Sequence, residues 1–266
     1  MPAPTPTTTA DRPDSPRELP AVALPALPSL ARQAERLVTL GVADLAGLTP
    51  DDLRVLAHDA DASTPGTAAG ADPASPDVTR SHLTTSHRLL VVPPALVPVS
   101  VLAPLMRRGE RAGFVVEDMT DVDAFAPIPG VDVPDAPYVL DGPDRGDDLA
   151  GWSPDEAGVE LARRGRTPLT LAEGVQWVLQ APDVLERKRC FMTIGSRVAK
   201  ARGGRDGGGR ARGGLDARTP AVWISNGTGR DGRERRDAPK VGWCWAGNRH
   251  TWLGFASARS RVALTR

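Results

Sequence analysis

KVGWCWAGNRHTWLGFASA, residues 240–258, is the stretch that most strongly constrains the fold of the C-terminal half. It holds three of the six tryptophans of the chain, one of its two cysteines and one of its four histidines. Tryptophan is large and rigid, so such a cluster builds either a core or a binding face. Alternating apolar residues predict strands at 241–245 and 251–256, and the intervening Ala246–His250 has a length suited to a β-hairpin loop.

The rest of the chain predicts an α+β fold, with an N-terminal helical hairpin, a mixed middle region and a C-terminal antiparallel sheet. Helical spacing and the Thr49-Pro50 cap signature predict the helical hairpin. Two later helices begin with capping signatures, at Ser153-Pro154 and at Thr170 with Glu173. We expect helices at 99–108, 153–164 and 170–180, and strands at 88–92, 113–119, 137–141, 190–194 and 221–225.

The domain organisation follows from changes in composition along the chain. Pro-, Thr-, Ala- and Gly-rich stretches cannot bury enough apolar surface to order themselves, so they are typical of tails and linkers. We expect a disordered tail at 1–24, the helical hairpin at 25–58, a flexible linker at 59–80, an α+β domain at 81–258 with a Gly/Arg-rich insertion at 201–214, and a tail at 259–266.

The net charge of zero hides an uneven distribution. Residues 1–150 carry 11 Arg against 22 Asp and Glu, whereas residues 151–266 carry 22 Lys and Arg against 11 Asp and Glu. The basic C-terminal half can bind nucleic acid or another anion. The same split also suits two halves that pack on each other with complementary fields.

Composition also indicates the compartment. Two cysteines are too few for a disulfide framework, and no basic and apolar N-terminal pattern predicts a signal peptide. The apolar run Leu89–Met106 contains four prolines, which argues against a membrane helix. We therefore expect a soluble cytoplasmic protein that does not bind membranes.

The sequence excludes several familiar sites. Gly227–Gly232 matches G-x-G-x-x-G, but no room for a helix follows it and no acidic residue lies beyond Asp237 to hold a ribose. The acidic clusters around Asp121 and Asp147 lack EF-hand spacing. The chain carries no G-x-S-x-G elbow and no P-loop. We predict no cofactor and no metal ion.

A binding or interaction module is the leading functional hypothesis. Its ligand face would lie in residues 240–258, which we call the aromatic segment. A large aromatic surface beside a polar loop can hold a planar or sugar-like ligand. The competing interpretation is a sheet packed on the helices beneath an exposed loop. The candidate ligand-binding residues are Trp243, Trp245, Asn248, Arg249, His250, Trp252 and Arg197.

Two alternative functions remain open. The first is an enzyme that uses His250 as a base with Cys190 or Cys244 as nucleophile, or with Asp147 and Asp148. Cys190, Cys244 and His250 are also ligand types that zinc accepts. The second is nucleic-acid or anion binding through the basic C-terminal half.

Five motifs resemble an uncharacterised bacterial family of actinobacterial type. They are RCFMTIGSR at 189–197, TPAVWIS at 219–225, PKVGWCWAGNRHTWLGFASA at 239–258, FVVEDMTDVDAFAPIPGV at 114–131 and DRGDDLAGWSPDEA at 144–157. The resemblance covers residues 25–258, and within it GWCWAGNRHTWLG is the strongest signature. It implies a domain of unknown function and brings no activity with it. The stretches 59–80 and 203–214 look like departures from the family pattern.

Overall fold

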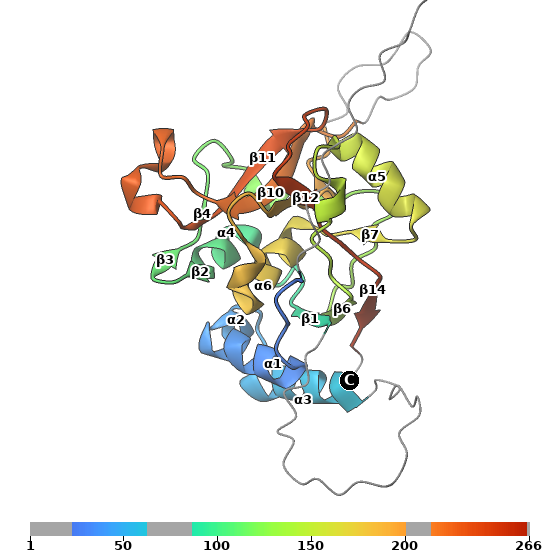
Figure 1. Ribbon diagram of the computed structural model, residues 1–266. Helices are drawn as coiled ribbons and strands as arrows, with labels where there is room; N and C mark the ends of the chain where they lie inside the picture. Colours follow the sequence, from blue (N-terminus) through green and yellow to red (C-terminus); the bar gives the residue numbers. More distant parts are fainter. Residues whose placement is uncertain (1–22, 63–86, 201–213, 265–266) are drawn as a thin grey trace, which may run out of the picture.

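The computed structural model describes residues 23–62, 87–200 and 214–264. Residues 59–62, expected to begin a flexible linker, are instead helical. The rest of the linker expected at 59–80 and nearly all of the tail expected at 1–24 and of the insertion expected at 201–214 lie outside the described residues. Figure 1 shows three N-terminal helices at the base of the molecule and the largest sheet at the opposite end. In the described part of the chain, no helix is long and apolar enough to cross a membrane.

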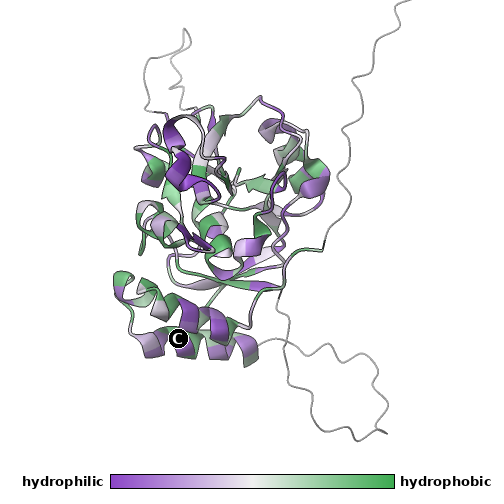
Figure 2. Ribbon diagram, turned by 60° about the vertical axis from the view of Figure 1, so that its left-hand side comes forward, coloured by the Kyte–Doolittle hydropathy of each residue, from purple (hydrophilic) through white to green (hydrophobic). Residues whose placement is uncertain are grey.

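The N-terminal helices pack together, as expected. The first, α1 (Leu30–Thr39), is capped by Ser29, whose side chain accepts from the Arg32 N–H. A short α2 (Val42–Leu45) follows, and then α3 (Pro50–Ala62), before which the Thr49 and Asp52 side chains bond each other's backbone N–H. Each long helix turns apolar residues inward and polar residues outward, and Figure 2 shows both kinds along these helices.

Gln33 joins these helices to the rest of the molecule. Its fully buried Nε2 donates to the Arg88 carbonyl at 2.7 Å, and its Oε1 accepts from the Leu90 N–H at 2.8 Å. Gln180 Nε2 donates in turn to the Gln33 carbonyl at 3.1 Å. A buried amide is tolerated when its hydrogen bonds are made, so Gln33 acts as a polar joint in an otherwise apolar contact.

A three-stranded antiparallel sheet lies next to the helices, in the order β1 (Arg88–Val91), β6 (Tyr138–Asp141) and β14 (Ser260–Ala263). The first two strands match the expected positions. The third falls within 259–266, where we expected a tail. Arg261 accounts for the difference, because its side chain is buried against Glu173 and holds the strand in place.

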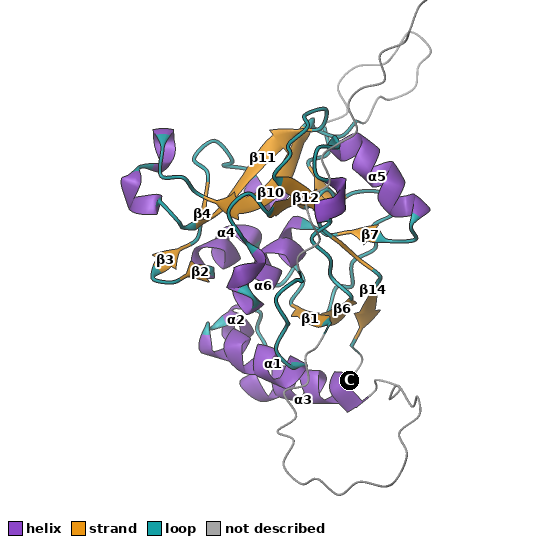
Figure 3. Ribbon diagram, in the orientation of Figure 1, coloured by secondary structure: helices purple, strands orange, loops and turns teal. Residues whose placement is uncertain are grey.

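The largest sheet has five strands in the order β12 (Leu253–Phe255), β8 (Cys190–Met192), β10 (Arg218–Ile224), β11 (Pro239–Trp245) and β4 (Phe114–Val115). Figure 3 labels four of these strands, β12, β10, β11 and β4. The central strands β8, β10 and β11 run antiparallel, and each edge strand runs parallel to its neighbour. Helix α6 (Leu171–Gln180) packs on this sheet, with the Trp177 and Phe191 rings 5.4 Å apart. The α+β class is confirmed.

The predicted hairpin between 241–245 and 251–256 is wrong. Strands β11 and β12 are separated in the sheet by β10 and β8. The physical reason is the competition for strand edges. All seven residues of β10 pair with β11, from Arg218 opposite Trp245 to Ile224 opposite Pro239, and β12 pairs instead with β8. Nearness in sequence favoured the hairpin, but the longer ladder lies between more distant segments.

Short elements complete the fold around these two sheets. Helix α5 (Pro154–Arg163) begins at the Ser153-Pro154 cap that its sequence predicts, and the Ser153 and Glu156 side chains form a capping box there. The remaining elements are α4 (Val99–Leu102), α5 (Pro154–Arg163), β2 (Arg107–Arg108), β3 (Arg111–Ala112), β5 (Ala126–Pro127), β7 (Thr167–Pro168), β9 (Ser196–Arg197), β13 (Ser257–Ala258) and the 3-10 turns η1 (Ala103–Leu105), η2 (Val122–Ala124), η3 (Asp147–Leu149), η4 (Pro182–Val184), η5 (Gly229–Asp231) and η6 (Arg233–Arg235).

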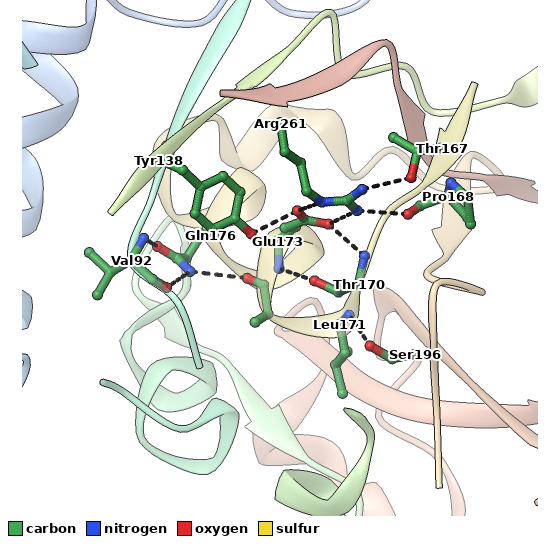
Figure 4. A network of polar contacts seen from close by, with 11 residues as sticks. Val92, Tyr138, Thr167, Pro168, Thr170, Leu171, Glu173, Gln176, Ser196 and Arg261 are labelled. Carbon is green, nitrogen blue, oxygen red and sulfur yellow. Dashed lines mark hydrogen bonds and ion pairs between the residues drawn. The ribbon is translucent and has the colours of Figure 1, made fainter. Parts of the chain in front are cut away.

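A buried polar network ties α6 to the strands β6 and β14 (Figure 4). Glu173 is fully buried and completes the capping box of α6 with Thr170, as the sequence predicts. The same carboxylate accepts from the Tyr138 hydroxyl at 2.7 Å and from Arg261 Nε at 2.6 Å. Burial, together with the adjacent Glu173 carboxylate, raises the pKa of Tyr138. Gln176, one turn further on, bonds both the N–H and the carbonyl of Val92.

We predict that Arg261→Met lowers the free energy of unfolding by about 3–5 kcal/mol, because it leaves the buried Glu173 carboxylate without its cation. The matched control is Arg259→Met, two residues earlier, where the ion pair with Asp141 is largely exposed and the expected change is about 1 kcal/mol or less. Urea unfolding followed by circular dichroism measures both. Equal effects of the two substitutions would contradict this role of Arg261.

Two glycines of the aromatic segment offer a second test. A Cβ on Gly254 would lie 2.3 Å from the Arg145 carbonyl oxygen, whereas a Cβ on Gly247 would meet nothing within 4 Å. We expect Gly254→Ala to lower the free energy of unfolding by about 1–3 kcal/mol, and Gly247→Ala to change it by about 0.5 kcal/mol or less. Thermal unfolding checks the pair. A neutral Gly254→Ala would show that β12 does not pack as described.

Candidate functional site

The predicted site residues fall on separate parts of the sheet, because the hairpin that would have united them does not form. Trp243 and Trp245 lie on β11, with their rings 4.7 Å apart and nearly perpendicular. Trp245 is about half exposed (49%). The Arg218 guanidinium lies 6.0 Å from the Trp243 ring centre and is bound to Asp121 through two hydrogen bonds.

The segment between β11 and β12 braces the start of α5. Arg249 pairs with Glu156 and donates to the Gly151 carbonyl, and Gly151 N–H donates to the His250 carbonyl at 2.9 Å. Asn248 is exposed, and its N–H closes the turn on the Trp245 carbonyl at 3.0 Å. These contacts give the turn a structural role beside any role in binding.

His250 belongs to an aromatic row. Its ring lies edge-on to Trp252 at 5.6 Å, and Trp252 lies edge-on to Trp223 at 6.3 Å. Burial lowers the pKa of His250, and its Nε2 is buried without a hydrogen-bond partner among the described residues. Trp223 was not among the predicted site residues, although it stands in the TPAVWIS motif.

The catalytic pairings considered for His250 are not formed among the described residues. Asp147 is bound to the buried Arg145, and Asp148 pairs with Arg164. Burial raises the pKa of both Cys190 and Cys244 to about 11, which keeps each thiol protonated at neutral pH and a poor nucleophile. In the part of the chain that the structure describes, no group of three or more His, Cys, Asp or Glu side chains could hold a metal ion.

A cavity of about 660 Å³ lies beside α5, and we call it the α5 cavity. Helix α5 forms one wall through Gly158, Val159 and Ala162, and the segment 128–131 contributes another. Its lining also includes Pro154, Asp155, Gly165, Arg166, Thr167, Pro168, Ile194, Arg197, Leu215 and Arg259. Three arginines and one aspartate thus stand among mostly apolar or small residues, so the cavity is basic as well as apolar.

Arg197 is the candidate residue that the structure places in this cavity. Its Nε donates to the Asp216 carbonyl at 2.8 Å, and its Nη1 donates to Thr219 Oγ1 at 2.7 Å. Both acceptors are uncharged, and no carboxylate of the described residues pairs with Arg197. Burial lowers the pKa of the Arg197 guanidinium. Within the described chain, the side chain is therefore a partly desolvated cation that forms no direct ion pair, although the Asp155 and Asp216 carboxylates act on it through their charge.

Arg166 repeats this pattern nearby. Its Nε donates to Ser257 Oγ at 2.7 Å, and its Nη2 donates to the carbonyls of Gly142 and Ser257. Within the described ranges it has no acidic partner, unlike the third arginine of the cavity, Arg259, which pairs with Asp141. Arg166 carried no motif signal in the sequence, because only the folded chain brings it to the same cavity as Arg197.

A smaller cavity of about 250 Å³ lies at the β4–β11 edge of the large sheet, and we call it the indole cavity. Trp223 and Trp243 line it together with Lys240. Lys240 Nζ bonds both carboxylate oxygens of Asp231, at 2.8 and 2.7 Å. Asp231 belongs to the G-x-G-x-x-G segment. This segment forms the 3-10 turn η5, and a second 3-10 turn, η6, follows it, so no α-helix begins here, in agreement with the interpretation of the segment as a loop.

Comparison with known proteins gives one relationship. No curated protein and no solved structure shows a significant match to this chain. The profile of a family of unknown function, DUF5701, matches residues 36–264, which include the helices α3 and α6, both sheets and both cavities. The chain therefore belongs to the DUF5701 family of unknown function.

Proposed function

We propose that this protein is a binding module, and that the α5 cavity takes a small molecule with an anionic head group and an apolar body. The observation that carries the proposal is Arg197, a half-buried guanidinium whose hydrogen bonds go only to uncharged oxygens of the described residues. A charge withdrawn from water is costly unless it is paired, so a ligand anion would supply the missing partner.

The hydrogen-bond inventory favours a head group between two arginines. Toward the described residues, Arg197 donates from Nε and Nη1, which leaves its Nη2 for a ligand. Arg166 donates to the same part of the chain from Nε and Nη2, which leaves its Nη1. A carboxylate or phosphate can accept from both, and guanidinium groups suit these planar or multidentate anions.

The remaining wall of the cavity favours an apolar body. Val159 is largely exposed (74%) and Leu215 partly so (40%), and both line the cavity beside Ile194. Burying such side chains against a ligand stabilises a complex by roughly 25 cal/mol per Å² of apolar surface. A volume of about 660 Å³ lies within the range of about 300–1,000 Å³ usual for small-molecule sites.

The aromatic segment contributes positioning in this proposal. Through Arg249 and His250 the turn after β11 holds the residues that precede and cap α5, and α5 forms a wall of the cavity. No reaction is proposed, because the alternative of His250 acting with a cysteine or aspartate finds no formed pair in the described residues.

We also propose that GWCWAGNRHTWLG, residues 242–254, is the signature of a bacterial family. A separate proposal is that the protein acts in the cytoplasm. Both Cys190 and Cys244 are free thiols, which suits a reducing compartment. Fractionation of the source cells tests the location. Recovery from the medium or the cell envelope alone would contradict it.

We predict that octanoate or octyl phosphate binds at least about 10-fold more tightly than uncharged 1-octanol, as measured by isothermal titration calorimetry.

Arg197→Gln is expected to weaken binding of the anionic ligands by about 10-fold to 100-fold, because the variant cannot donate a hydrogen bond from a charged group. Arg166→Gln should act in the same direction, whereas Arg259→Gln should have a small effect because Arg259 is already paired.

Two substitutions of Gly158 on α5, one small and one large, test whether the ligand occupies the α5 cavity itself. A Cβ on Gly158 would lie 3.9 Å from Ile194 Cδ1, an ordinary contact, so Gly158→Ala should bind normally. Gly158→Met sends a long side chain into the cavity and should abolish binding while the melting temperature is kept. Equal affinity for octanol and octanoate, or unchanged binding in Arg197→Gln and Gly158→Met, would overturn the proposal.

A further inference from the structure

The indole cavity opens beside an unusually basic surface, which the proposed function does not use. The β2–β3 hairpin and the turns η5 and η6 lie on the same side of the molecule in Figure 1, and Arg111 Nη1 donates to the Glu234 carbonyl at 3.0 Å across them. We call the arginines of this region the basic cluster. They are Arg107, Arg108, Arg111, Arg187, Arg230, Arg233, Arg235 and Arg236.

In the segments 107–111 and 230–237, seven arginines stand against four acidic residues, Glu110, Asp231, Glu234 and Asp237. Asp237 alone faces three guanidinium groups, those of Arg108, Arg187 and Arg236. No carboxylate of the described chain pairs with Arg230 or Arg235, although both line the indole cavity. Such an excess of positive charge attracts a polyanion or a phosphate group.

Inside the cavity, the polar groups are held in fixed positions. The Lys240 ammonium lies 5.1 Å from the Trp223 ring centre and is bound to Asp231, which also accepts from Ser225 Oγ at 2.8 Å. The Trp223 ring lies against Gly242, where a Cβ would be only 2.4 Å from Trp223 Cη2. The absence of a side chain at residue 242 therefore lets the Trp223 indole take this position beside the cavity.

Aromatic rings beside arginines that have no carboxylate partner in the described chain are suited to a nucleobase and its phosphate. Indole rings stack on the π-face of any nucleobase, and arginines bind the phosphate that accompanies it. A volume of about 250 Å³ is below the range of about 300–1,000 Å³ for drug-sized ligands, so the cavity suits one flat ring system. Glu117 and Asp118 also line it, and because their charge repels a phosphate, the phosphate is expected at Arg230 and Arg235.

We infer that the indole cavity binds one nucleotide unit, with its base against Trp223 and Trp243 and its phosphate on Arg230 and Arg235. A free nucleotide and a nucleotide within a single strand present the same chemistry. The inference is independent of the α5 cavity, which shares none of its lining residues.

The test uses the full chain, a fluorescein-labelled single-stranded DNA of 12 mixed nucleotides, and AMP. Fluorescence anisotropy measures the DNA at several salt concentrations, and calorimetry measures AMP. Arg230→Gln/Arg235→Gln should weaken DNA binding by about 10-fold or more at low salt. It should also reduce the slope of log K against log salt by about 0.7 for each phosphate group that the variant no longer binds. The charge-matched control, Arg36→Gln/Arg163→Gln, lies on exposed helix surfaces and should change neither quantity.

A second variant separates stacking from simple charge attraction. Trp243→Leu should weaken binding by about 10-fold, with circular dichroism and the melting temperature reporting whether the fold is kept. Binding of AMP with the same dependence on Trp243 identifies a free nucleotide as sufficient, whereas binding of DNA alone identifies a strand. Both results support the inference.

Three results would overturn it. The first is no binding of either probe at low salt. The second is DNA binding that depends on the arginines but is unchanged in a folded Trp243→Leu protein. The third is DNA binding that disappears when residues 203–212 are deleted but does not respond to Trp243→Leu or Arg230→Gln/Arg235→Gln. The arginine variant changes exposed or half-exposed side chains only, so it decides the question even if Trp243→Leu does not fold.

Discussion

The buried carboxylate of Glu173 is the interaction on which the architecture most depends. It caps α6 through Thr170, accepts from Tyr138 on β6 and pairs with Arg261 on β14. A fully buried carboxylate is stable only when its cation and hydrogen bonds are all present. Segments far apart in the sequence are therefore required to meet at one carboxylate, which positions the helix and the two strands together.

The same network reaches the α5 cavity. Besides Glu173, the Arg261 guanidinium bonds Thr167 Oγ1 and the Pro168 carbonyl of β7. Thr167 and Pro168 line the cavity, directly after Arg166. The Glu173 network thus holds the two residues that follow Arg166, whereas the Arg166 guanidinium itself is held by Ser257 and Gly142. The aromatic segment braces the cavity from the other side, through Arg249 and the first turn of α5. Fold and candidate site share one set of constraints.

Local signals in the sequence predicted local structure well. The Ser153-Pro154 cap, the capping box at Thr170 and the strands at 88–92 and 137–141 depend on neighbouring residues, and the structure confirms them. The partner of β11 could not be predicted, because strand pairing depends on competition between distant segments. For the same reason the sequence left Arg261 in an expected tail and did not bring Arg166 to Arg197. Of the candidate site residues, Arg197 lines the α5 cavity and Trp243 lines the indole cavity.

The central claim is that the Arg197 guanidinium, which has no carboxylate partner in the described chain, binds the anionic group of a ligand. A crystal structure of the protein soaked with octyl phosphate tests this most directly. We predict that the phosphate lies within hydrogen-bond distance of Arg197 Nη2 and Arg166 Nη1, with the alkyl chain along Val159 and Ile194. An empty α5 cavity in crystals that hold the ligand elsewhere, or a ligand seated there with its phosphate turned to solvent, would contradict the claim.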